Sequence, residues 1–334
     1  MSWNVSRRGL LAGVLGLGAL AACGEAKAGP GEGDGGGPWA FTDDRGTDVS
    51  LPARPQRIVA YVGSAAALHD FGVDRQLVGT FGPLKGADGG KDPLAGDLDP
   101  ARLESLGNAW GEFNLEKYAT LRPDLLVTNM YEPNALWYVP DDSKDKIATL
   151  APSVGLTVAR TTLLKVIERY GALAVSLGAD VSAKPVADAK ARFEAASEAV
   201  RAAVKANGGL KVLAASASAD LLYVSDPKVY ADLSYYQELG VDVIVPGQVT
   251  GGYFENLSWE NADKYKADVI LLDSRTSALQ PKDLTAKPTW AALPAAKAGQ
   301  IVPWLSEPRF SYAGCAAPLE TLAKALQSAR KVAS

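Results

Sequence analysis

Short apolar runs alternate with segments of helical periodicity along the chain from Trp39 onward. The runs are typical of buried strands, and the segments between them place apolar residues at the spacing of an amphipathic helix. This alternation predicts an α/β protein whose sheets are parallel or mostly parallel and are covered by helices. The predicted strands are 57–62, 76–80, 124–128, 211–215, 221–224, 242–245, 268–272 and 301–304, and the predicted helices are 65–71, 115–121 and a last one from Ala316.

The middle of the chain departs from this alternation. Apolar residues recur at helical spacing over 163–177, Gly178 stands where a helix commonly ends, and a second long helix is predicted over 186–204. A helical bridge between two lobes explains two long helices in succession most simply, and one large sheet with a long crossover is the alternative. The expected organisation is an N-terminal lobe at 39–160, a bridging helix at 161–180 and a C-terminal lobe at 181–334.

A short pattern occurs once in each predicted lobe. Asn114-Leu115-Glu116 ends eight positions before Asp124, and Ser258-Trp259-Glu260 ends eight positions before Asp268. Both copies combine a cap residue, an apolar residue and a Glu with one short helix and an Asp that opens a buried strand. A pair of matches at one spacing in opposite halves supports two related lobes.

The glutamates of this pattern have two interpretations. Asn114 and Ser258 are favourable N-caps, which would place Glu116 and Glu260 at the second helical position, beside the positive end of a helix dipole. That stabilising role is a sufficient reason for either residue taken alone. Together, one carboxylate on each lobe could bind a pair of cationic sockets on a two-fold partner.

The first residues have the pattern of an export signal. Arg7-Arg8 precedes the apolar segment Gly9–Ala22, whose 14 residues are too short to span a membrane as a helix. The arginine pair resembles a twin-arginine signal, and Leu20-Ala21-Ala22-Cys23 looks like a bacterial lipobox, in which the Cys becomes lipid-modified. A buried N-terminal helix is the alternative, but it leaves the arginine pair unexplained. We expect a lipoprotein signal peptide at 1–22 and lipidation at Cys23.

Residues 23–38 are rich in glycine and contain no large apolar residue. Such a segment cannot offset the entropy of ordering by burying apolar surface, so it is expected to be a flexible tether. The protein is thus predicted to be exported and lipid-anchored to the outer face of the cytoplasmic membrane.

Composition excludes several classes of function. The chain has 334 residues, of which 47% are hydrophobic, and a net charge of −4, with no basic block that would favour nucleic acid as a partner. It has one histidine, His69, and two cysteines, Cys23 and Cys315, so a site needing several imidazoles or thiolates cannot form. We expect a monomer with no resident cofactor and no metal bound directly by the protein.

An exported hydrolase is the main enzymatic alternative. Gly63-Ser64 follows a predicted strand, but Ala66 fills the last position of what would be a nucleophile elbow, and His69 is the only imidazole. The sequence therefore favours a protein that is not an enzyme. A surface adhesin or sensor with the same two-lobed fold is a further alternative.

Four segments of the N-terminal half resemble a known family. Thr42-Asp43-Asp44-Arg45-Gly46, the run from Leu51 to Val59, Asn114-Leu115-Glu116 and Leu121-Arg122-Pro123-Asp124 resemble the solute-binding lipoproteins of iron–siderophore, haem and cobalamin ABC importers. The resemblance extends over 39–330 and is looser in the second half, where Ala267-Asp268 replaces Pro-Asp. It implies two lobes joined by one long bridging helix, a ligand cleft between them, and docking of Glu116 and Glu260 onto arginines of a dimeric permease.

The carboxyl ends of the predicted strands indicate where a ligand would bind. In open α/β sheets ligands lie beyond these ends, and here two such edges would face across a cleft. Aromatic residues with one or two arginines at these ends suit a bulky, partly apolar iron chelate. The candidate ligand-binding residues are Tyr61, Trp110, Tyr131, Trp137, Tyr223, Arg275, Trp304, Arg309 and Tyr312.

The expected ligand is a ferric siderophore. With only Arg275 and Arg309 as candidate cleft arginines, a hydroxamate siderophore is favoured over a highly anionic catecholate or citrate type. Haem and cobalamin are the alternatives that the family resemblance leaves open.

Overall fold

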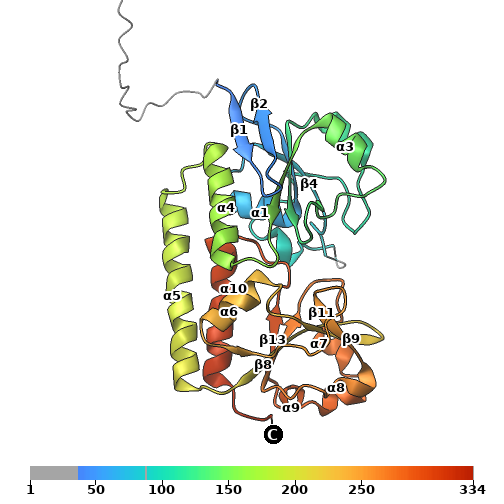
Figure 1. The fold of residues 1–334 in the computed structure, drawn as a ribbon, viewed down its shortest axis with the longest axis vertical. Helices are drawn as coiled ribbons and strands as arrows, with labels where there is room; N and C mark the ends of the chain where they lie inside the picture. Colours follow the sequence, from blue (N-terminus) through green and yellow to red (C-terminus); the bar gives the residue numbers. More distant parts are fainter. Residues whose placement is uncertain (1–36, 87–88, 334) are drawn as a thin grey trace, which may run out of the picture. The chain divides into compact units, whose positions relative to one another are not determined.

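The computed structural model describes residues 37–86 and 89–333. The predicted signal peptide at 1–22, the lipidation site Cys23 and all but the last two residues of the predicted tether at 23–38 lie outside the described residues. The described chain forms two α/β lobes, each built on its own sheet (Figure 1). The predicted fold class is therefore confirmed.

The first lobe is built on a five-stranded parallel sheet with strand order β5-β4-β3-β6-β7. Its central strands β3 (Ile58–Tyr61) and β6 (Leu125–Met130) are buried along their whole length, because helices and loops cover both faces. The other elements of this lobe are β4 (Leu77–Phe81), β5 (Glu104–Ser105), β7 (Ser153–Thr157), α1 (Val62–Asp70), η1 (Pro93–Ala95), α2 (Leu115–Leu121) and α3 (Lys144–Leu150).

The second lobe is built on a six-stranded mixed sheet. Its main path is β11-β9-β8-β12-β13, with β10 paired to β8, and only the β8–β9 and β9–β11 pairs are antiparallel. The strands are β8 (Lys211–Ala217), β9 (Leu221–Ser225), β10 (Asp242–Val243), β11 (Phe254–Ser258), β12 (Val269–Asp273) and β13 (Ile301–Trp304). The helices are α6 (Ala231–Glu238), η2 (Trp259–Asn261), α7 (Pro281–Leu284), α8 (Pro288–Ala292) and α9 (Pro294–Lys297).

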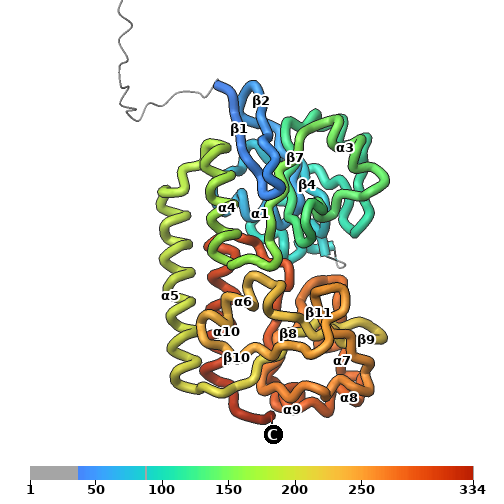
Figure 2. The backbone as a smooth tube through the Cα atoms, viewed as in Figure 1, coloured from blue at the N-terminus to red at the C-terminus, as the bar shows by residue number. Residues whose placement is uncertain are grey.

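Three longer helices connect the lobes. The helix in the range predicted for the bridge is α4 (Leu163–Ser176), which packs on α1, β1 and β7 of the first lobe and on α6 of the second. It is followed by the longest described helix, α5 (Lys184–Ala206), which lies beside α10 (Tyr312–Ser328) (Figure 2). The exact domain bounds given above stay a prediction.

The hairpin of β1 (Trp39–Thr42) and β2 (Asp48–Leu51) explains the aspartates of the first resemblance motif. The carboxylate of Asp43 accepts a hydrogen bond from the Gly155 N–H at 3.0 Å, and that of Asp44 accepts one from the Thr157 N–H at 2.8 Å. Arg169 of α4 donates to Asp44 at 2.7 Å. The motif thus satisfies backbone groups on the free edge of β7, a position that a sheet must protect.

The repeated pattern corresponds to a repeated structural element. The carboxylate of Asp124 accepts hydrogen bonds from Gln56 N and Arg57 N at 2.8 and 2.9 Å, where β6 begins beside β3. In the second lobe Asp268 accepts one from Lys211 N at 2.8 Å, where β12 begins beside β8. Each aspartate therefore fixes the start of one buried strand against its neighbour.

Candidate functional site

Glu307 lies where side chains of the two lobes meet. The Tyr61 hydroxyl donates to Glu307 Oε2 at 2.5 Å, and the Trp137 ring nitrogen donates to the same oxygen at 3.0 Å. The second oxygen, Oε1, accepts a hydrogen bond from Arg275. Tyr61 is at the end of β3, Trp137 follows β6, and Arg275 follows β12, so residues distant in sequence converge on this carboxylate.

The guanidinium of Arg275 is already paired with two carboxylates. Its Nε and NH2 groups donate to Asp273 Oδ2 at 3.0 and 2.7 Å, and its NH1 group donates to Glu307. Burial alone would lower the pKa of Arg275, but the charges of Asp273 and Glu307 outweigh it and raise the pKa. The cation is therefore fixed in place and its charge is compensated within the protein.

A pocket of about 270 Å³ opens beside Arg275 in the second lobe. Tyr223 meets Phe254 edge to face, with ring centroids 5.0 Å apart, and Tyr230 meets Trp304 in the same way at 5.3 Å. The predicted site residues Tyr223, Arg275 and Trp304 are thus brought together in one pocket. Its walls also include Ser216, Ala217, Ser218, Ser225, Asp273, Ser277, Ala278 and Ser306.

The first lobe contributes an aromatic cluster. Trp110 packs on Trp137 with ring centroids 4.7 Å apart, and Tyr131 packs on Trp137 at 4.6 Å. Tyr138 contacts both Trp110, at 5.0 Å, and Tyr61, at 5.2 Å. Trp110 is 62% exposed, so a large flat surface remains accessible at the edge of the cluster. The four aromatic residues predicted in this lobe therefore lie together.

Tyr131 also joins the lobes through its backbone. The Tyr253 hydroxyl of the second lobe donates to the carbonyl of Tyr131 at 2.6 Å, and Arg160 donates to the same carbonyl at 3.2 Å. The Tyr131 hydroxyl and the Ser306 hydroxyl are both buried and have no hydrogen-bond partner. Because buried polar atoms are normally satisfied, these two hydroxyls are candidates for contact with a bound ligand.

Arg309 and Tyr312 have protein partners in this structure. The Arg309 guanidinium pairs with Asp70 at 3.2 Å and with Asp97 at 3.6 Å. Tyr312, at the start of α10, packs edge to face on Phe71 and Phe193. Arg309 therefore holds the segment between β13 and α10 against the first lobe, and ligand contact by these two residues stays a prediction.

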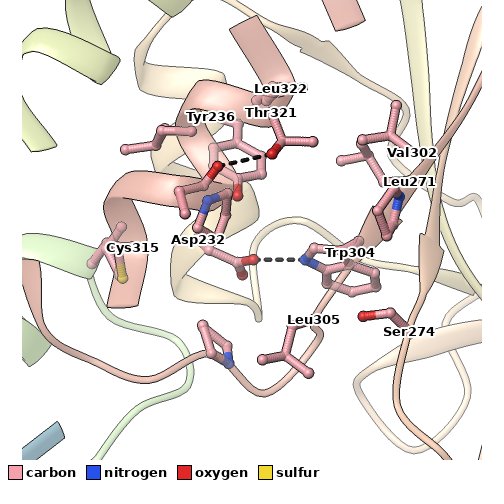
Figure 3. Close-up of a pocket in the computed structure, with 16 residues that line it drawn as sticks. Asp232, Tyr236, Leu271, Ser274, Val302, Trp304, Leu305, Cys315, Thr321 and Leu322 are labelled. Atoms are coloured by element: carbon pink, nitrogen blue, oxygen red, sulfur yellow. Dashed lines mark hydrogen bonds between the residues drawn. The ribbon is translucent and has the colours of Figure 1, made fainter. Parts of the chain in front are cut away.

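Trp304 separates the pocket beside Arg275 from a second pocket of about 230 Å³. Figure 3 shows the Asp232 carboxylate facing the Trp304 ring nitrogen, which donates to it at 2.6 Å. The second pocket is lined mainly by aliphatic and proline side chains of β13 and α10. Burial raises the pKa of Asp232 to about 6, although the hydrogen bond from Trp304 opposes the shift.

Replacing Asp232 by Asn is expected to stabilise the protein at pH 7.5 and to have little effect near pH 3.5, below the pKa of the carboxyl in the unfolded state. The native carboxyl has a higher pKa than the unfolded one, so the native state binds more protons between about pH 4 and 6 and the wild type loses stability as the pH rises. The upper limit of the gain at pH 7.5 is about 3 kcal/mol. Urea denaturation at both pH values measures it, with the exposed Asp220→Asn as control, and a gain independent of pH would contradict the prediction.

The two predicted docking glutamates are exposed on different lobes. Asn114 caps α2 by accepting a hydrogen bond from Lys117 N at 2.9 Å, which confirms the predicted cap and places Glu116 in the first turn. Glu260 lies in the single turn η2, and the Ser258 side chain makes no cap hydrogen bond there. The predicted capping by Ser258 was therefore wrong. Hydrogen bonds from its own N–H and from the Ser258 hydroxyl lower the pKa of Glu260.

Several residues of the site were not among the candidates predicted from the sequence. Asp273 is the last residue of β12, Glu307 follows β13, Tyr138 lies in the segment after β6, and Tyr253 lies in the loop before β11. The same strand-end criterion that selected the aromatic residues would have found Asp273 and Glu307 if it had been applied to acidic side chains. Tyr138 adopts a positive φ of 61°, which the sequence does not indicate.

Two further properties concern the described part of the chain. No group of three or more His, Cys, Asp or Glu side chains within 37–86 and 89–333 could hold a metal ion. In the same residues no helix has the length and apolar character needed to cross a bilayer.

Comparison with known proteins gives one family match and several structural relatives. Residues 60–308 match the family model described as periplasmic binding protein, whereas no curated protein matches the chain. DesE, a ferric-siderophore receptor protein from Streptomyces coelicolor, is 49% identical, with a TM-score of 0.85 over 88% of this chain and 99% of that chain.

Two more distant structures share the fold. The iron uptake ABC transporter substrate-binding protein PiuA from Streptococcus pneumoniae is 19% identical, with a TM-score of 0.61 over 86% of this chain and 97% of its own. The petrobactin-binding protein YclQ from Bacillus subtilis is 15% identical, with a TM-score of 0.65 over 87% of this chain and 99% of its own.

Proposed function

The chain belongs to the periplasmic binding protein family, and on that premise we propose that it captures a ferric siderophore outside the cytoplasm and delivers it to an ABC permease. The observation that carries the proposal is the 49% identity to a ferric-siderophore receptor along 99% of that receptor's length. The similarity therefore spans both lobes and the residues between them. Binding proteins of this family act as carriers and not as enzymes, and we extend this role to the present chain.

The surfaces around Glu307 suit a bulky chelate. The aromatic cluster of the first lobe offers an accessible flat face at Trp110, and the pocket beside Arg275 offers the rings of Tyr223 and Phe254. The Tyr131 and Ser306 hydroxyls lack partners and can donate hydrogen bonds to ligand oxygens. A siderophore combines these features, since its backbone is partly apolar and its iron-binding groups present oxygen atoms.

We favour a hydroxamate siderophore because the arginines of this region are not free. Arg275 is paired with Asp273 and Glu307, and Arg309 with Asp70. A ferric tris-catecholate carries several negative charges and needs uncompensated cations, whereas a ferric tris-hydroxamate centre is neutral. Haem and cobalamin remain the alternatives within the same family.

The cellular arrangement is proposed from the sequence. The lipobox would anchor the protein through Cys23 to the outer face of the cytoplasmic membrane, with residues 23–38 as the tether. Glu116 and Glu260 would dock onto a dimeric permease, and the protein would act as a monomer. Export and lipidation can be tested by labelling cells with a fatty-acid analogue, using Cys23→Ala as the unlabelled control.

Ferrioxamine B is expected to quench the tryptophan fluorescence of the purified protein with a Kd in the micromolar range or tighter. Trp304 lines the pocket beside Arg275, and Trp110 and Trp137 belong to the aromatic cluster of the first lobe. Ferric enterobactin is expected to bind at least tenfold more weakly, for lack of free cations. Haem and cobalamin serve as the family alternatives, and iron-free desferrioxamine as the control for the metal. Tighter binding of the catecholate would contradict the hydroxamate assignment, and no binding of any of these compounds would contradict the proposed function.

A further inference from the structure

The carboxylate of Glu307 is the only group in the described lobe interface that accepts hydrogen bonds from three side chains of both lobes: Tyr61, Trp137 and Arg275. It is 6% exposed, so its charge acts in a region of low dielectric constant, where Coulomb interactions are strong. The charge of Glu307 contributes to raising the pKa values of Tyr61, Tyr131 and Tyr138, after the larger effect of burial. Its field therefore extends over the aromatic cluster.

Charges at the lobe interface are predominantly negative. Three arginines there are each paired with at least one carboxylate, and Asp92 of the first lobe adds another acid that contacts Thr276 of the second at 3.2 Å. Burial raises the pKa of Asp92, and Glu307 adds to that effect. The described groups in these contacts are the arginines Arg160, Arg275 and Arg309 and the acids Asp70, Asp92, Asp97, Glu132, Asp273 and Glu307.

We propose that Glu307 determines which chelate charge the site accepts, favouring cationic chelates over neutral ones and excluding anionic ones. The inference rests on the proposed function and deepens it. Arg275 donates through NH1 to Glu307 and through Nε and NH2 to Asp273. An anionic ligand oxygen thus meets a guanidinium whose three nitrogens all donate to carboxylates, and it also meets the charge of Glu307. A cationic arm of a chelate is attracted by the same carboxylate.

Glu307→Gln tests this inference with three ferric chelates of different charge. The probes are ferrioxamine B, whose pendant amine is protonated, its N-acetylated neutral derivative, and ferric enterobactin, which is anionic. In the wild type, ferrioxamine B is expected to bind tightest and ferric enterobactin weakest. In the variant, the preference for ferrioxamine B over the acetylated derivative is expected to fall about tenfold, and affinity for ferric enterobactin to rise by a similar factor.

The matched control is Glu198→Gln on α5, which removes the same charge from an exposed side chain. It is expected to change each Kd by less than twofold. If the wild type binds none of the probes, the proposed function fails. If the wild type binds the probes and Glu307→Gln leaves the affinity ratio of ferrioxamine B to its acetylated derivative unchanged, only the inference about Glu307 fails.

A second measurement does not depend on the folding of the variant. In the wild type, the affinity ratio of ferrioxamine B to its acetylated derivative is expected to stay nearly constant as the salt concentration rises, because salt screens a buried charge such as that of Glu307 much less than an exposed one. The acetylated derivative carries no net charge and serves as the reference in each salt condition. A ratio that falls to one at high salt would overturn the inference, because the preference would then come from exposed surface charges and not from Glu307.

Discussion

Exchanging Glu116 and Glu260 together for arginine is expected to abolish chelate uptake by cells, while the affinity of the purified protein for the chelate stays within twofold of the wild type. The two glutamates are exposed and belong to α2 and η2, on different lobes, and neither contacts Glu307 or the pocket beside Arg275. If they dock onto permease arginines, each reversal replaces an attraction by a repulsion. Like charges brought together in an interface cost several kcal/mol, so the double variant should lose well over a thousandfold in docking affinity.

The control for this experiment is Glu194→Arg combined with Glu198→Arg, which changes the net charge equally on the exposed side of α5. Uptake of radioactive ferric chelate and binding to the purified protein are measured for both double variants. Normal uptake with Glu116→Arg and Glu260→Arg would remove the docking assignment. A loss of chelate binding in that variant would instead show that the glutamates support the fold or the ligand site.

The secondary structure was predictable where burial imposed a regular pattern. Helix α2 begins and ends at the predicted residues, because Asn114 caps it and the strand after it starts with three apolar residues and is buried along its whole length. Helix α4 was also predicted closely, since its buried side chains follow helical spacing from Leu163 to Ala174. Strand β7 was missed because Gly155 and polar end residues interrupt its apolar run.

The pairings at the candidate site were not predictable in the same way. Glu307 is 170 residues from Trp137 and 246 from Tyr61, and only the packing of the two lobes brings them together. Strand ends indicated which segments face the site, but they did not indicate which charges neutralise each other. Arg309 illustrates this limit, because it follows a strand as expected and yet pairs with Asp70 of α1. Long-range pairing of charges depends on tertiary geometry, which local patterns do not encode.

Replacing Asp268 by Ala is expected to lower the free energy of unfolding by about 3 kcal/mol, the largest loss among the single substitutions considered. Asp268 is fully buried, and its carboxylate accepts hydrogen bonds from three backbone N–H groups, of Lys211 at 2.8 Å, Val332 at 2.6 Å and Ala333 at 2.7 Å. The substitution leaves buried donors without an acceptor and releases the C-terminal segment from the start of β12. Urea denaturation at pH 7 measures the loss.

The pH dependence separates this effect from a simple loss of packing. Burial alone would raise the pKa of Asp268, but the three backbone hydrogen bonds and the nearby Lys331 lower it below its ordinary value. A carboxyl with a lowered native pKa stabilises the protein above its unfolded pKa, and this contribution disappears as the pH falls through the native pKa. The difference between wild type and Asp268→Ala should therefore shrink below about pH 4.

Asp124→Ala provides the matched control in the first lobe. Asp124 stands at the same place in the repeated pattern, but its carboxylate accepts two backbone N–H groups, and it is only partly buried. Its replacement should therefore cost less than that of Asp268, because water can reach the donors that are left. Equal losses at the two positions would contradict this account, since the repeated aspartates would then stabilise their strands independently of burial and of the C-terminal contacts.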